Sequence, residues 1–137
     1  MATHTLNGIQ LKVRGSPDYV FKFVINNGTE LKVRGSPDYV IKFVIKVAKS
    51  EADAGRWDVA RFVLVQLNNE FLNEFTLKEV HDMCCIWART ELNTKGPSAA
   101  LQVLTDLLDM IPIESELYDP LLATVGVVGA MAINCPR

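Results

Sequence analysis

The sequence predicts an α+β protein in which an N-terminal four-stranded antiparallel β-meander packs against a C-terminal bundle of about four helices. Two observations predict this class. Residues 7–26 are repeated almost unchanged as residues 27–46, and apolar residues in this half alternate with polar ones. From about Val47 the apolar spacing changes to the helical period. We therefore expect a single domain, residues 1–137, with a duplicated β-hairpin sheet over residues 1–46 and a helical part over residues 47–137.

Each repeat unit has the pattern of two strands joined by a turn. In the first unit, residues 9–13 and 19–25 alternate, and Gly15-Ser16-Pro17-Asp18 between them are typical turn residues. Asn26-Asn27-Gly28 joins the two units, and Asn-Gly between alternating runs favours a hairpin. Residues 31–45 repeat the scheme, so the sequence predicts two near-identical hairpins in one sheet.

The predicted sheet has one apolar face and one basic face. The basic face is the candidate interaction surface, and its residues are Lys12, Arg14, Lys22, Lys32, Arg34 and Lys42. Three interpretations are open: a solvated face that discourages aggregation, a surface for an acidic protein, or a surface for nucleic acid. The aromatic residues lie in the opposite register, where they cannot stack on bases, so nucleic acid is the least favoured of the three.

The second half carries helix start and stop signals. Ser50 with Asp53 predicts a short capped helix, and Ala54-Gly55-Arg56 predicts a break after it. Apolar residues at helical spacing then predict a helix over residues 57–74. Thr76 and Glu79 form a capping box that predicts a helix to about residue 92.

Two more helices are expected after this one. The first covers residues 99–110 and is ended by Pro112, and the second covers residues 120–133. The uncharged segment 121–133 is shorter than the roughly 20 residues that a membrane span requires. We therefore expect a buried helix here and no contact with a membrane.

Two segments resemble the helical hairpins of the tetratricopeptide family. Residues 52–60, with Ala52, Gly55, Trp57 and Ala60, resemble the turn of such a hairpin, and residues 95–104 are similar to it at a few positions. The match is limited to a few small and aromatic positions, without the family's fuller signature. It implies an antiparallel array of helices, a scaffold that binds protein segments.

Charge is distributed unequally along the chain, whose formal net charge is −2. Residues 1–46 contain seven basic and three acidic residues, whereas residues 47–137 contain seven basic and thirteen acidic residues. Opposite charge on the two halves favours head-to-tail contacts between copies. The repeated hairpins also suggest domain swapping, because each unit offers nearly the same contacts as the other.

His81, Cys84 and Cys85 lie within about one helical turn. A structural zinc site needs four ligands, and no second cluster of histidine or cysteine supplies the others. We interpret these residues as core packing, and expect neither a metal site, nor a cofactor, nor a catalytic centre. Three cysteines, two of them adjacent, do not form a disulfide framework, which favours a reducing, cytoplasmic compartment.

These observations favour a non-enzymatic interaction or assembly protein. It would self-associate or bind a protein partner through the basic sheet face, the sheet edges and the acidic helical half. The alternative is a module that binds nucleic acid through the basic face.

Overall fold

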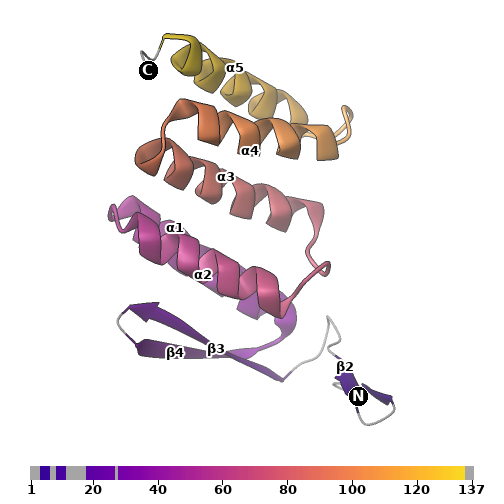
Figure 1. The fold of residues 1–137 in the computed structure, drawn as a ribbon. Helices are drawn as coiled ribbons and strands as arrows, with labels where there is room; N and C mark the ends of the chain where they lie inside the picture. Colours follow the sequence, from indigo (N-terminus) through magenta and orange to yellow (C-terminus); the bar gives the residue numbers. More distant parts are fainter. Residues whose placement is uncertain (1–3, 7–8, 12–17, 27, 135–137) are drawn as a thin grey trace.

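The computed structural model describes residues 4–6, 9–11, 18–26 and 28–134, with five stacked helices and a hairpin at one end of the stack (Figure 1). The strands are β1 (His4–Leu6), β2 (Ile9–Leu11), β3 (Tyr19–Asn26) and β4 (Thr29–Gly35). The helices are α1 (Pro37–Asp53), α2 (Trp57–Glu70), α3 (Leu77–Thr94), α4 (Pro97–Met110) and α5 (Tyr118–Asn134). β1 pairs only with β2, and β3 only with β4, both antiparallel, among the described residues.

The prediction of a four-stranded meander is wrong. Residues 39–45, expected to form the fourth strand, lie in α1. The described part of the first expected strand, β2, pairs with β1 and not with β3. The hairpin predicted between the two units at Asn26-Asn27-Gly28 is confirmed as β3–β4, whereas the turn at residues 15–18 lies largely outside the described residues.

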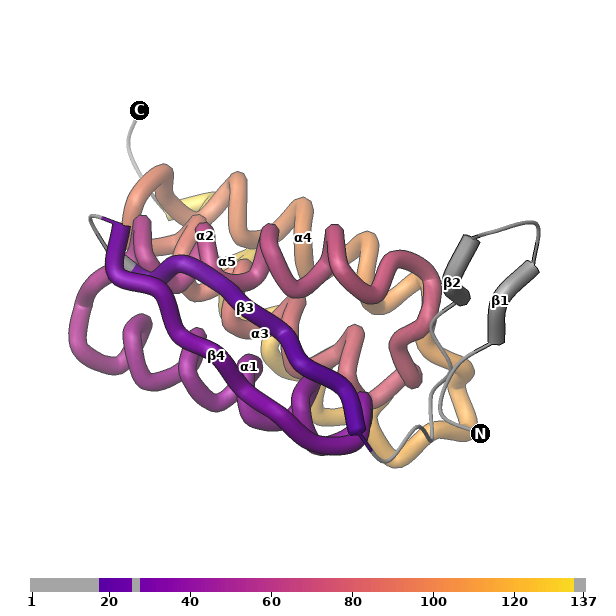
Figure 2. Tube along the Cα trace, turned by 90° about the horizontal axis from the view of Figure 1, so that it is seen from below, coloured from indigo at the N-terminus to yellow at the C-terminus, as the bar shows by residue number. Residues whose placement is uncertain are grey.

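The β3–β4 hairpin has the predicted apolar and basic faces. Phe21 pairs with Val33 and Phe23 with Leu31, and these side chains are buried or partly buried against the helices. On the outer face Lys22 lies directly opposite Lys32. Viewed from below, the hairpin lies across α1 and α2 (Figure 2). These two helices therefore cover the apolar face of the hairpin.

Helix α1 begins at the Ser-Pro-Asp sequence of the second repeat unit. The Ser36 hydroxyl accepts a hydrogen bond from the backbone N–H of Tyr39 at 3.2 Å, and Pro37 occupies the first turn, where its missing N–H costs nothing. Val40, Ile41, Val44 and Ile45 are buried at positions that share one helix face. Ser50 and Asp53 belong to the last turn of this helix, so the predicted short helix at these residues is wrong.

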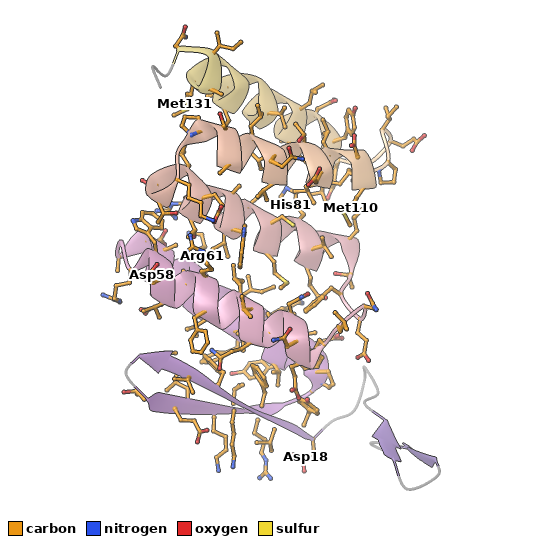
Figure 3. All side chains as sticks on the ribbon, in the orientation of Figure 1. Asp18, Asp58, Arg61, His81, Met110 and Met131 are labelled. Carbon is orange, nitrogen blue, oxygen red and sulfur yellow. The ribbon has the colours of Figure 1, made fainter. Side chains whose placement is uncertain are left out.

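The remaining helices follow the predicted order and form an array. The capping box is confirmed: Thr76 Oγ1 accepts from the N–H of Glu79, whose side chain accepts from the N–H of Thr76. Between α2 and α3, Arg61 donates to the buried carboxylate of Glu91 at 3.1 Å, and Figure 3 shows Arg61 on the side of α2 that faces α3.

The core consists of two apolar clusters on opposite faces of α3. One lies among the hairpin, α1, α2 and Ile86, and the other among α3, α4 and α5. The expectation that the last helix is buried is wrong. The buried residues of α5 are Leu121 and Val128, whereas Val127 is 63% and Ile133 is 85% exposed. No helix in the described part of the chain is long and apolar enough to span a bilayer.

Candidate functional site

The predicted basic surface is divided between two parts of the molecule. Lys22, Lys32 and Arg34 lie exposed on the outer face of the hairpin, where Arg34 forms an ion pair with Asp18 at 3.2 Å. Lys42 lies on α1 instead, because the second unit is helical there. Lys12 and Arg14 lie outside the described residues. The six residues therefore do not form one described surface.

A groove lies between α1 and the first half of α3. Its volume is about 1000 Å³, at the upper end of the range typical of ligand sites. We call it the α1–α3 groove, and it is lined by Asp38, Tyr39, Lys42, Phe43, Ile45, Lys46 and Lys49 of α1, and by Thr76, Lys78, Glu79, Asp82, Cys85 and Ile86 at and within α3. Sequence analysis missed this groove, because it depends on packing between helices that are distant in the chain.

Lysines form a row along one wall of the groove. Lys42, Lys46 and Lys49 are spaced at i, i+4 and i+7, which places them on one face of α1, and Lys78 stands on α3 opposite them. Lys49 bonds to Asp53 at 3.1 Å and Lys78 to Asp82 at 2.7 Å. Lys42 and Lys46 form no ion pair with another described residue. The site therefore presents two ammonium groups that have no ion-pair partner among the described residues.

Aromatic and aliphatic side chains supply the apolar lining. The rings of Tyr39 and Phe43 stack with centroids 6.1 Å apart, and Tyr39 is 53% exposed. The ring of Tyr39 lies against Gly35, where a Cβ atom would come within 2.8 Å of it and where φ is +157°. Glycine at this position thus allows the aromatic ring to pack beside the junction of β4 and α1. Ile45 and Ile86 are more deeply buried.

The far end of the lysine row is fixed by ion pairs between α1 and α3. Asp53 accepts hydrogen bonds from Arg89 of α3 and from Lys49. These two bonds lower the pKa of Asp53 below its ordinary value, in that order of importance. Arg89 also lies over the ring of Trp57 at 5.5 Å. This network links α1 to α3 beyond the end of the lysine row.

His81, Cys84 and Cys85 are partly buried on α3. The Nε2 atom of His81 lies 3.7 Å from the Sγ atom of Cys85. Burial, followed by the charge of Asp82, raises the pKa of Cys85 to about 11, and burial also raises the pKa of Cys84. Among the described residues, no three metal-binding side chains are grouped to hold an ion.

No protein-family model matches the chain, and neither a curated protein nor a solved structure is significantly similar to it.

Proposed function

We propose that this protein is a non-enzymatic interaction protein that binds an acidic amphipathic protein segment in the α1–α3 groove. The observation that carries the proposal is the combination of an apolar lining, from Tyr39, Phe43 and Ile86, with the adjacent lysines of α1. Apolar side chains of a partner would supply affinity through burial, and its carboxylates would supply orientation through the lysines.

Lys42 and Lys46, which have no ion-pair partner in the described part of the chain, give the groove its preference for negative charge. Asp82 is engaged by Lys78, and Glu79 is buried in the capping box, so these acidic groups do not neutralise Lys42 and Lys46. A segment that carries glutamate or aspartate beside leucine or isoleucine fits this arrangement. A basic segment of the same shape would bring like charges together.

Binding of nucleic acid to the outer face of the hairpin is the second candidate. Lys22 and Lys32 face each other across the two strands, and repulsion between them would be relieved by a phosphate group. The exposed apolar residue of this face is Val20, 36% exposed, and valine offers no ring for a base to stack on. This face therefore ranks below the groove.

We also propose a reducing compartment such as the cytoplasm for this protein. Cys84 and Cys85 are free thiols, and neighbouring cysteines that remain unpaired are typical of reducing conditions.

A designed peptide tests the proposed function. The probe is a fluorescently labelled helical 16-residue peptide of leucine and glutamate, and its control has lysine in place of every glutamate. Anisotropy should show binding of the acidic peptide alone, weakened about tenfold or more in the K42E/K46E variant. The matched variant K22E/K32E on the hairpin should bind the peptide normally. Equal binding of both peptides, or a loss confined to the hairpin variant, would refute the groove as the site.

The same variants decide between the two candidates. A labelled single-stranded oligonucleotide should bind weakly and without response to K42E/K46E. Tight oligonucleotide binding that is lost in K22E/K32E would favour the nucleic-acid alternative.

A further inference from the structure

The connection between α4 and α5 has the chemistry that the α1–α3 groove would recognise. We call residues 109–119 the acidic loop: it includes the end of α4, the connection and the start of α5. Its charged residues are Asp109, Glu114, Glu116 and Asp119, all exposed, and it contains no basic residue. Between these carboxylates, Met110 is 56% and Ile113 is 74% exposed. Acidic and apolar groups are thus presented together on one short segment.

The acidic loop is held in shape by its own hydrogen bonds. The backbone N–H of Ser115 donates to the carbonyl of Pro112 at 3.0 Å, and that of Tyr118 donates to the carbonyl of Ser115 at 3.0 Å. Ile111, 4% exposed, fixes the segment to the core formed with α4 and α5. Because the loop is already ordered, binding it elsewhere would cost little conformational entropy.

From this complementarity we infer that the α1–α3 groove binds the acidic loop of a second copy of the chain, so that the protein assembles head to tail. This inference rests on the proposed function of the groove and names its partner. Ile113 and Met110 would enter the apolar part of the groove, beside Tyr39 and Phe43. Glu114 and Glu116 would then lie near Lys42 and Lys46, which have no ion pair within the described chain.

Within one copy, the acidic loop does not line the α1–α3 groove. The groove lies between α1 and α3, whereas the acidic loop follows α4, with Met110 at the outer end of that helix (Figures 1 and 3). Each copy thus carries the groove on α1 and α3, and the acidic loop between α4 and α5. Such a heterologous contact closes into a ring or continues as a filament, depending on the rotation between copies.

The exposed side of α5 is the competing surface for self-association. It bears Leu122, Val127, Met131 and Ile133, and no charged residue occurs between Pro120 and Asn134. This surface has no charge that would select a partner. The groove and the acidic loop carry opposite charges, which favour their contact with each other. A contact through α5 is therefore an outcome that the experiment must be able to detect.

Charge reversal tests the inference on the full chain. Sedimentation velocity on the 15.2 kDa protein over a concentration series should show salt-sensitive assembly. The loop variant E114K/E116K and the groove variant K42E/K46E should each associate at least about tenfold more weakly. Mixing the two variants in equal amounts should restore assembly, because the reversed loop of one meets the reversed groove of the other. Restoration also shows that both variants are folded.

Several outcomes would overturn the inference. One is assembly that is unaffected by either reversal and abolished by V127E, since this result would place the contact on α5. Another is a wild-type chain that remains monomeric at low salt while its groove binds the acidic leucine–glutamate peptide; the proposed function would then stand without this partner. If the groove also fails to bind that peptide, both proposals are wrong.

Discussion

Residues 18–25 and 38–45 differ at one position, Phe21 or Ile41, yet the first segment forms strand β3 and the second lies in helix α1. The same side chains consequently have different environments. Val20 is 36% exposed, whereas Val40 is fully buried. Tyr19 packs on Phe71 in the core, whereas Tyr39 stands in the groove, 53% exposed.

The repeated segment can adopt both structures because its apolar residues fit two periods. In β3 the inward residues are two apart, as shown by the burial of Phe21 and Phe23. In α1 the buried residues are Val40, Ile41 and Val44, which share a helix face. The lysine at position 22 or 42 is exposed in either structure. Because the segment has so few polar residues, the spacing of its apolar residues does not indicate whether it forms a strand or a helix.

We attribute the structure of each copy to the residues that follow it and to the surfaces against which it packs. The Asn-Asn-Gly sequence ends the first copy after a length at which a helix is marginal, and Asn26 pairs with Thr29 at the end of the β3–β4 hairpin. The second copy continues through Val47 and Ala48 into a helix of 17 residues. Gln66 of α2 stabilises the strand further: its amide donates to the carbonyl of Val24 at 2.7 Å and accepts from its N–H at 2.8 Å.

Deletion of residues 27–46 tests this explanation and should have the largest effect. The first copy would then run directly into Val47 and Ala48, and we expect residues 18–26 to become helical. Backbone chemical shifts of Val20, Phe21 and Val24 would report the change. Phe21 would occupy the site of Ile41, where overpacking should cost about 1–3 kcal/mol of unfolding free energy.

Deletion of residues 7–26 is the matched control, because its product differs from the first only at the four positions where the units differ. Helix α1 should persist in it unchanged. A folded product of the first deletion with extended shifts at residues 18–25 would show that the following residues do not decide the structure.

Val20 and Val40 occupy equivalent positions in the two copies, and their replacement should show the next largest difference in unfolding free energy. V40A removes two buried methyl groups and should lower the free energy of unfolding by about 2 kcal/mol. V20A removes the same groups from a partly exposed strand position and should cost less than about 1 kcal/mol. Urea denaturation of both variants measures the difference. Equal losses would mean that the two environments are less distinct than the structure shows.

Lys22 and Lys42 occupy equivalent positions in the two copies, and their replacement should change the unfolding free energy least and with opposite signs. K22T introduces a β-branched residue into a strand and removes the repulsion from Lys32, so a gain of about 0.2–1 kcal/mol is expected. K42T places the same residue in a helix and should cost about 0.5 kcal/mol. Changes of equal sign at the two positions, measured by urea denaturation, would contradict the assignment of strand and helix to the two copies.

Sequence analysis succeeded where signals were local and failed where they were not. The capping box at Thr76 and the Asn-Gly hairpin were predicted because each depends on a few adjacent residues. Helix α1 was missed although Ser36 and Pro37 are a helix start signal, because the same residues also suit a turn between strands. The groove could not be predicted, since it requires α1 and α3 to pack together.

The sequence by itself determined which residues are apolar, where turns and caps occur, and that basic residues concentrate near the N-terminus. Only the tertiary structure decided that one copy of the repeat is a strand and the other a helix, and that Lys42 faces a groove and not a sheet surface. The physical reason is that burial depends on a partner surface: α1 and α2 pack against the hairpin that contains the first copy, whereas α2 and α3 pack against the helix that contains the second copy.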